Sequence, residues 1–461
     1  MSLPEQPLSP LDGRYRAAVG GLGEFLSEAG LNRARVQVEV EWLIYLTDHE
    51  LFGSTRLGQD AARALRALVA DFGQAEIDEL ATLEATTRHD VKAVEYLVRN
   101  KLAALGLTEV AELTHFACTS EDINNLSYAL TIGSAVREVW LPRIRGVVAS
   151  LRSLASEHRA VPMLAHTHGQ PATPTTVGKE FAVYVHRLER VLAQVEATEY
   201  LGKFSGATGT FSAHVSADPS QDWPAISREF VTSLGLSWNP LTTQIESHDW
   251  QSELYSQISH ANRILHNLCT DIWTYISMGY FTQIPQAGAT GSSTMPHKIN
   301  PIRFENAEAN LELSSALLES LAQTLVTSRL QRDLTDSSAQ RNIGVALGHS
   351  VLALDNIGRG LGEFSVDTAK LASDLDSNWE ILGEAIQTVI RAEITAGRSS
   401  IADPYALLKD LTRGRRITQD DLIAFVDALD IGQEAKDGLR ALTPATYIGL
   451  ASELVDYILA N

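Results

Sequence analysis

The stretch Gly288-Ala289-Thr290-Gly291-Ser292-Ser293-Thr294-Met295-Pro296-His297-Lys298-Ile299-Asn300-Pro301 interrupts the chain between two long helical patterns. It joins two glycines and two adjacent serines to a His-Lys pair and an asparagine. Glycine and proline favour turns, and serine and threonine compete for backbone hydrogen bonds, so the stretch predicts a polar loop. Loops held by a rigid scaffold often carry catalytic groups. We interpret this one as a candidate active-site loop, with an ordinary connection between helices as the alternative.

The sequence around this loop predicts an all-α fold. In the segment 176–201, apolar residues such as Val177, Phe181, Tyr184 and Leu188 recur at steps of three and four, as on one face of a helix. Similar patterns cover roughly 132–158, 249–281, 303–328 and 338–364. Helices of about 25 residues would be nearly 40 Å long and fit an elongated antiparallel bundle. The only strand candidates are short and lie near 203–216.

Three helical domains are expected along the chain. Residues 1–112 form an N-terminal domain, in which the helical pattern begins near Leu22. Residues 113–366 form the central domain of the long-helix bundle. Residues 367–461 form a C-terminal domain of shorter helices, punctuated by Gly397, Pro404 and Gly432.

Composition limits the possible partners. The 461 residues are 44% hydrophobic and 20% charged, as in an ordinary soluble globular protein. The net charge of −20 argues against nucleic acid or an anionic membrane as a partner, because both require a basic surface. No secretory leader and no apolar run of about 18 residues is present, which predicts a cytoplasmic protein. Cys118 and Cys269 are expected to be buried free thiols.

Other polar stretches join the loop as candidate site segments. Residues 86–90 read Thr-Thr-Arg-His-Asp, where a threonine or the aspartate is the expected helix N-cap and His89 alone is most simply structural. Thr119 or Ser120 can cap the helix that follows 115–125. Residues 165–174 hold two histidines, a glycine and two prolines, and 329–341 is rich in charges and hydroxyls. Together these stretches supply imidazoles, hydroxyls, amides and cations, which is an inventory for acid–base chemistry on an anion.

Several other functions find less support. The sequence has no HExxH or CxxC zinc pattern, no P-loop, no GxGxxG and no GxSxG. The alternation of His166 and His168 keeps a metallohydrolase as a remote alternative. A non-enzymatic helical scaffold is the other, although loops this dense in titratable groups speak against it. We predict no metal and no cofactor.

The loop GSSTMPHKINP at 291–301 resembles the signature loop of the fumarase/aspartase superfamily, whose members eliminate fumarate from a substituted succinate. Within that superfamily the chain resembles the bacterial type of the adenylosuccinate lyase family. The matching stretches are TTRHDVKAVEY at 86–96, HFACTSEDINNLSYAL at 115–130, THGQPATPTTVGKE at 167–180 and RDLTDSSAQRN at 332–342. The resemblance implies a three-domain, nearly all-helical subunit in a homotetramer, with each active site built from three chains.

The resemblance also implies an activity and its catalytic residues. The expected reaction releases fumarate from adenylosuccinate to give AMP, and from SAICAR to give AICAR, in purine biosynthesis. Carried over, Ser292 is the general base, His168 the general acid, and Glu305 the partner that orients the histidine. Lys298 and Asn300 would hold a substrate carboxylate, and His89 would contact the substrate from another subunit. Another lyase of the superfamily, of the argininosuccinate or carboxymuconate type, is the alternative.

The resemblance further implies the residues that bind the substrate. Arg14, Tyr15, Ser337, Ser338 and Arg341 would bind its phosphate, the two serines at a predicted helix N-terminus. Thr119, Ser120, Gln244 and Arg332 would hold the succinyl carboxylates and neighbouring groups. The remaining expected contacts are Arg88, Asp90, Ser293, Ile299 and Asn306. Arg88 departs from the family, which commonly has Asn or Ser there, and we expect its side chain to point outward; His297 helps to identify the family but has no derived role.

Overall fold

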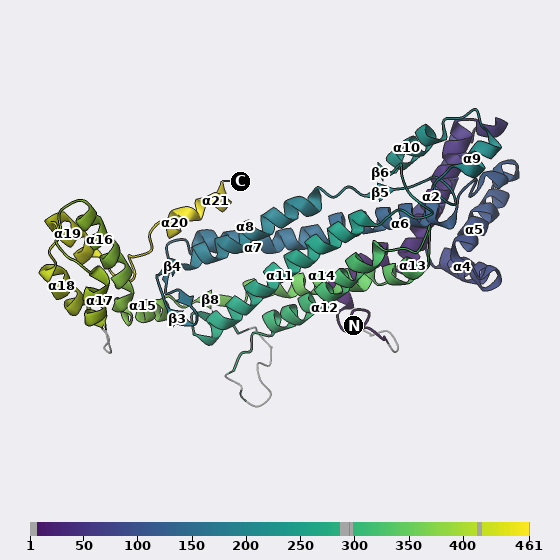
Figure 1. The fold of residues 1–461 in the computed structure, drawn as a ribbon. Helices are drawn as coiled ribbons and strands as arrows, with labels where there is room; N and C mark the ends of the chain where they lie inside the picture. The colour runs from purple at the N-terminus through teal and green to yellow at the C-terminus, as the bar shows by residue number, and fades with distance from the viewer. Residues whose placement is uncertain (1–6, 286–294, 296–297, 413–416, 461) are drawn as a thin grey trace. The chain divides into compact units, whose positions relative to one another are not determined.

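The computed structural model describes residues 7–285, 295, 298–412 and 417–460. The long elements are helices (Figure 1). They are α1 (Arg16–Leu26), α2 (Glu28–Asp48), α3 (Gln59–Ala70), α4 (Gln74–Thr87), α5 (Asp90–Ala104), α6 (Ser120–Ser134), α7 (Leu141–Glu157), α8 (Val177–Glu196), α9 (Ser212–Ala217), α10 (Trp223–Ser233), α11 (Asp249–Ser277), α12 (Ile302–Leu325), α13 (Thr335–Gln340), α14 (Ile343–Leu361), α15 (Thr368–Asp376), α16 (Gly383–Thr395), α17 (Pro404–Thr412), α18 (Gln419–Ala428), α19 (Gln433–Ala441), α20 (Ala451–Leu454) and α21 (Asp456–Leu459). Short 3₁₀ turns lie at Leu51–Gly53, Thr108–Leu113 and Trp379–Leu382, and a π-helical segment lies at Ala135–Trp140.

Strands are few and short in the described part of the chain. They are β1 (Pro162–Met163), β2 (His166–Thr167), β3 (Gln170–Pro171), β4 (Thr175–Thr176), β5 (Leu201–Gly202), β6 (Ser237–Trp238), β7 (Phe281–Gln283) and β8 (Phe364–Val366). The pairs β1–β4, β2–β3 and β7–β8 are antiparallel, and β5–β6 is parallel. The predicted all-α fold is confirmed.

The chain divides into two compact units. Unit 1 comprises residues 1–145, 191–263 and 307–355, and unit 2 comprises 146–190, 264–306 and 356–461. The three domains expected from the sequence, with boundaries at 112 and 366, stay a prediction. No helix in the described ranges is both long enough and apolar enough to span a membrane.

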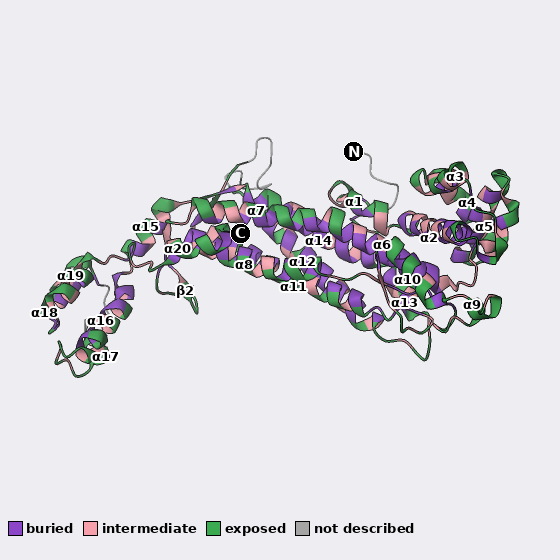
Figure 2. Ribbon diagram, turned by 90° about the horizontal axis from the view of Figure 1, so that it is seen from above, coloured by how far each residue is buried: buried purple, intermediate pink, exposed green. Residues whose placement is uncertain are grey.

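The helix α2 organises the N-terminal part of unit 1. Its apolar residues Val36, Val40 and Leu43 are fully buried, and they pack in one cluster with residues of α3 and α5 such as Leu65 and Val94. Figure 2 shows the buried face of α2 against neighbouring helices. Because α2 also packs against α6, polar side chains on α2 can reach the start of α6.

A buried polar network sets the register of the bundle segments in unit 1. The indole of Trp140 donates to Ser350 on α14 over 2.9 Å, and the Ser350 hydroxyl donates to Asn262 on α11 over 2.8 Å. The Asn262 amide donates to Ser314 on α12 over 3.0 Å. A fully satisfied network of this kind allows only one alignment of the helices, since any slip would leave buried polar groups unpaired.

Unit 2 contains the remaining parts of the long helices and the C-terminal helices. Gly178 at the start of α8 allows close packing, because a Cβ there would lie 2.3 Å from the Ala155 carbonyl oxygen of α7. In α8, Tyr184 donates to Asp271 of α11. The C-terminal helices bury their own cluster, which includes Ile386, Ile390 and Val426.

Some expectations from the sequence need correction. The helical pattern assigned to 132–158 begins earlier, at Ser120, and continues through the π-helical segment into α7. The strand candidate near 203–216 is wrong: the strand ends at Gly202, positive φ angles at Gly206 and Gly209 bend the chain, and 212–217 is helical. Neither cysteine forms a disulfide, as expected, but only Cys269 is buried and Cys118 is half-buried.

Candidate active site

The turn between α4 and α5 presents His89. Arg88 ends α4 in the left-handed conformation, with a φ of 51°, and is exposed, consistent with the expected outward side chain. His89 is the N-cap of α5, where its Nδ1 accepts a hydrogen bond from the Lys92 N–H over 3.3 Å. The expected caps, a threonine or Asp90, are therefore wrong, because Thr87 still belongs to α4 and Asp90 begins α5. The imidazole is exposed.

Asp90 joins this turn to two arginines. Its Oδ2 lies 2.9 Å from Nη2 of Arg35 and 3.2 Å from Nη2 of Arg341. Burial would raise the pKa of Asp90, but the charges of Arg35 and Arg341 and the hydrogen bonds from Arg35 and Val91 outweigh it, so its pKa lies below the usual value. The carboxylate thus stays charged and holds Arg341 near the start of α5.

A buried ion pair at the start of α6 brings Thr119 and Gln244 to one place. The Asp122 carboxylate accepts from the Thr119 N–H over 2.8 Å and lies 3.0 Å from Nζ of Lys203, and both charged side chains are almost completely buried. Lys203 in turn donates to the Gln244 carbonyl oxygen over 2.8 Å. Thr119 is the N-cap and Ser120 the first residue of α6, as the sequence predicted.

The residues around α13 hold the other expected anion-binding groups. Arg332 precedes α13, and its Nη1 lies 3.0 Å from Oε1 of Glu121. This contact is an ion pair without hydrogen-bond geometry, since Nη1 makes no hydrogen bond in the described structure. Ser337 and Ser338 lie in the first turn of α13, where the sequence predicted a helix N-terminus, and Arg341 ends that helix.

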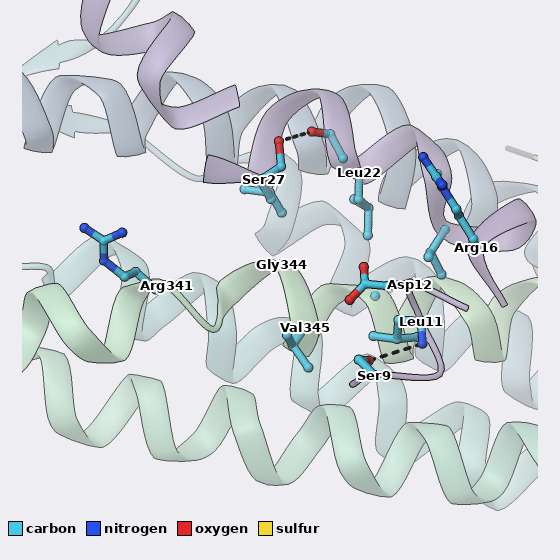
Figure 3. Close-up of a pocket in the computed structure, with 14 residues that line it drawn as sticks. Ser9, Leu11, Asp12, Arg16, Leu22, Ser27, Arg341, Gly344 and Val345 are labelled. Carbon is cyan, nitrogen blue, oxygen red and sulfur yellow. Dashed lines mark hydrogen bonds between the residues drawn. The ribbon is translucent and has the colours of Figure 1, made fainter. Parts of the chain in front are cut away.

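A pocket of about 560 Å³ lies beside Arg341 in unit 1 (Figure 3). Its walls come from the turn before α1, from α1 itself and from α14. Figure 3 shows Arg16 and Arg341 towards opposite ends of the pocket with Asp12 between them. Arg14 and Tyr15, in the same turn, do not line it; the Arg14 guanidinium lies 5.9 Å from the centre of the Tyr15 ring.

In unit 2, His168 lies at the tip of the β2–β3 hairpin. Thr167 pairs with Gln170, so His168 and Gly169 form a two-residue turn, and both have positive φ, 55° and 74°. This is the signature of a type I′ turn, which glycine adopts without strain and which few other residues tolerate. His168 is exposed, so the hairpin presents its imidazole outward.

The segment leading into α12 holds the other predicted residues of unit 2. Lys298 and Ile299 are exposed and Asn300 is half-buried. Glu305 accepts a hydrogen bond from the Trp273 indole over 3.1 Å, and no contact between described residues joins it to His168. Asn306 accepts from the Asn356 amide over 3.0 Å. Ser292, Ser293 and His297 lie outside the described residues.

The structure therefore brings together some of the predicted residues. In unit 1, Asp90 contacts Arg341, and the Asp122–Lys203 pair connects Thr119 with Gln244. Sequence reasoning missed the buried partners: Arg35, Glu121, Asp122, Asn124 and Lys203. One signal was available, because Glu121, Asp122, Asn124 and Asn125 are a dense polar run at the start of an otherwise apolar helix, and all four are buried.

Comparison with known proteins gives full-length matches. The family model described as "Lyase" matches residues 13–312, and the one described as "Adenylosuccinate lyase C-terminal" matches 328–448. The proteins named adenylosuccinate lyase from Escherichia coli (strain K12) and Haemophilus influenzae are each 48% identical over 97% of this chain and 98% of their own.

Solved structures show the same fold. A fumarate lyase from Mesorhizobium sp. BNC1 is 20% identical and superposes with a TM-score of 0.74 over 96% of this chain and 98% of its own. A 3-carboxy-cis,cis-muconate lactonizing enzyme from Pseudomonas putida is 19% identical and superposes with a TM-score of 0.74 over 97% of this chain and 98% of its own. The chain belongs to the adenylosuccinate lyase family, within the fumarase/aspartase superfamily.

Proposed function

We propose that this protein eliminates fumarate from adenylosuccinate to give AMP, and from SAICAR to give AICAR. The observation that carries the proposal is the 48% identity, over 97% of this chain, to a protein named adenylosuccinate lyase. The arginines of unit 1 support it, because a substrate with a phosphate and two carboxylates needs cations in a protein whose net charge is −20. Arg332 and Arg341 flank α13 and supply such cations.

The proposed chemistry is an anti-elimination with one base and one acid. Ser292 takes the proton from the substrate Cβ, the electron pair forms the double bond of fumarate, and the C–N bond breaks. His168 gives its proton to the departing nitrogen. Lys298 and Asn300 hold the carboxylate onto which negative charge spreads as the C–H bond breaks. Glu305 would pair with the general acid His168 of another chain, and His89 would contact the substrate from a third chain.

The proposed substrate contacts fall in two groups. Arg14, Tyr15, Ser337, Ser338 and Arg341 bind the phosphate, and Thr119, Ser120, Gln244 and Arg332 hold the succinyl end. The pocket beside Arg341, at about 560 Å³, falls within the ordinary range for small-ligand sites. It supports a nucleotide-sized ligand near this arginine.

We also propose a cytoplasmic homotetramer with shared active sites. Exposed apolar side chains on the long helices support an oligomer, among them Leu313 of α12, which is 52% exposed, and Val326 just beyond it, at 44%. The exposed position of His168 on its hairpin also suits a group that acts in a site completed by other chains.

An absorbance assay of fumarate release from adenylosuccinate tests the proposal. The wild-type protein should turn the substrate over, and Ser292→Ala and His168→Ala should each lower kcat by about 10²- to 10⁴-fold, the usual contribution of one acid or base. Ser150→Ala, at a half-buried position on α7, and His186→Ala, at an exposed position on α8, are matched controls and should retain activity. Near-normal turnover by Ser292→Ala would show that another group is the base.

The assay also separates the other lyases of the superfamily. The muconate enzymes among the solved structures are too distant in sequence to indicate more than a fold. Turnover of argininosuccinate or a carboxymuconate, with none of adenylosuccinate, would overturn the proposed substrate.

A further inference from the structure

A continuous series of polar contacts runs through the interior of unit 1 between the two arginines that flank α13. It passes through α6, α2 and the first residue of α5, which lie close together (Figure 1). We call it the α6 relay, and its members in order are Arg332, Glu121, Asn124, Arg35, Asp90 and Arg341.

Each link of the relay is short. Glu121 forms the ion pair with Arg332 at 3.0 Å, and its Oε1 accepts from the Asn124 amide over 2.7 Å. Asn124 Oδ1 accepts from Nε of Arg35 over 2.9 Å. Arg35 Nη2 then lies 2.9 Å from Asp90, which Arg341 reaches at 3.2 Å.

Asn124 is the central link, and its orientation is determined by its neighbours. Its oxygen faces a guanidinium, which can only donate, and its amide nitrogen faces a carboxylate, which here accepts. No other rotation of the amide satisfies both partners. The amide therefore fixes the position of Arg35 relative to Glu121.

The middle of the relay is shielded from water. The Arg35 side chain is 3% exposed and that of Glu121 is 8% exposed. Buried charges are costly unless every partner is in place, so the members hold one another in a single arrangement. Neither Arg35 nor Asn124 is accessible to a ligand, whereas the terminal Arg341 is 40% exposed.

We propose that Arg35 and Asn124 are positioning residues, which act through the relay to fix Arg332 and Arg341 at the separation that the two anionic ends of one substrate require. This inference rests on the proposed function only for what the arginines bind. The two arginines lie in different turns beside a helix of six residues, and each is anchored by a carboxylate from another element. The relay joins those carboxylates, Glu121 and Asp90, so the two anchors cannot shift independently.

The variant Asn124→Leu tests the relay, because leucine has a similar size and makes neither hydrogen bond. Its matched control is Asn262→Leu, which removes another buried amide from the separate network with Ser314 and Ser350 in the same unit. Hydrogen–deuterium exchange is measured at 86–92 and 329–342 in the purified full-length proteins without ligand. We expect faster exchange at both segments in Asn124→Leu and wild-type exchange there in Asn262→Leu.

The affinity for AMP gives a second readout. We expect Asn124→Leu and Arg35→Met to weaken AMP binding about tenfold, equal to about 1.4 kcal/mol, and Asn262→Leu to change it by less than about twofold. Arg35→Lys keeps the charge but replaces two separate donor nitrogens, Nε for Asn124 and Nη2 for Asp90, by a single ammonium nitrogen, so it should fall between wild type and Arg35→Met. If Asn124→Leu matched wild type in exchange and in AMP affinity, or if Asn262→Leu altered them equally, the relay would have no positioning role.

A wild-type protein that neither bound AMP nor cleaved adenylosuccinate would overturn the proposed function, while the exchange comparison would still decide whether the relay positions the two arginines.

Discussion

At the scale of single residues, Glu39 shows how a buried carboxylate controls its neighbour. It is fully buried on α2, and it accepts from the His115 N–H over 3.0 Å and contacts the His115 Nδ1 at 2.6 Å. Burial lowers the pKa of His115, but the hydrogen bond and charge of Glu39, with smaller contributions from other carboxylates, outweigh it. The pKa of His115 therefore lies above its usual value, so folding favours protonation of this imidazole.

The variant His115→Gln should lose stability in a pH-dependent way. Since folding raises the pKa of His115, its contribution is fully present below the unfolded pKa of about 6.5 and is lost as pH rises through the folded pKa. We expect the free energy of unfolding of the variant to fall below that of the wild type by about 1.5–3 kcal/mol near pH 6, as for a charge-assisted hydrogen bond. The difference should shrink towards pH 9. Thermal or urea unfolding of both proteins across this range measures it.

His214 provides the control with the opposite sign. Burial lowers its pKa, so its contribution is present at high pH and is lost as pH falls. The difference between wild type and His214→Gln should therefore change with pH in the reverse direction. A loss of stability in His115→Gln that did not vary with pH would contradict a charged pair of His115 and Glu39.

The residues of the site differ in how far the sequence could predict them. Arg332, Arg341 and His168 lie in motifs that the resemblance identifies, so each was predicted by position. The proposed positioning residues Arg35 and Asn124 were not predicted, because they are 89 positions apart and only the packing of α2 on α6 brings them together. A buried arginine in a helix gives no local sign of which carboxylate it will meet.

At the scale of elements, a very short hairpin, β2–β3, carries the proposed general acid His168. Its strands have two residues each, and the turn depends on positive φ at both His168 and Gly169. Nothing lies within 4 Å of the place a Cβ would occupy on Gly169, so the constraint on this residue is conformational and not steric crowding.

Gly169→Ala should therefore affect activity more than stability. A left-handed conformation costs an alanine about 1–2 kcal/mol, which the small hairpin relieves by shifting. Displacing the acid by about 1 Å is expected to lower kcat by about 10- to 100-fold. Gly106→Ala is the matched control, because Gly106 also has a positive φ and open space around its Cβ, but it lies beyond α5. Equal losses of activity in the two variants would argue against a special role for the hairpin.

The helices themselves were largely predictable. Steps of three and four between apolar residues placed α8, α11, α12 and α14, because a half-buried helix must show that period. The cap of α6 at Thr119 or Ser120 was predicted, but the long helical pattern was drawn only from 132, since the first turns of α6 bury polar residues such as Glu121 and Asn124 that look like a loop. The π-helical segment at Ala135–Trp140 could not be predicted, because its apolar and charged residues read as ordinary helix.

At the scale of the whole molecule, the predicted residues are divided between two units. The proposed phosphate contacts, together with His89 and Arg332, belong to unit 1, whereas His168, Glu305 and the proposed carboxylate contacts Lys298 and Asn300 belong to unit 2. The sequence ranges of each unit are interleaved, so groups far apart in the chain share a unit. We propose that each complete set of active-site residues forms where subunits meet.

Mixing two inactive variants tests that proposal. His89→Ala and Ser292→Ala should each be inactive alone, but hybrids formed by joint refolding should regain activity wherever an intact copy of each residue meets. With random assembly from equal amounts, and the two residues supplied by different chains, about a quarter of the sites would be intact. Fumarate release is the measurement, and each variant refolded alone is the control. Absence of rescue, with subunit exchange verified by tagged chains, would exclude sites shared in this way.

The ion pairs of Arg341 have a consequence for how any anion binds there. Its Nη1 already donates to Glu28 over 2.6 Å and its Nη2 donates to Asp90, so the guanidinium is paired with two carboxylates before any ligand binds. Glu28 is mostly exposed and Asp90 is held by Arg35, so we expect a phosphate that binds at Arg341 to displace Glu28 first. Binding at this point is thus an exchange of one counter-ion for another. Because the displaced Glu28 carboxylate remains attached nearby, we expect the affinity to reflect a competition between the ligand and the protein's own carboxylate.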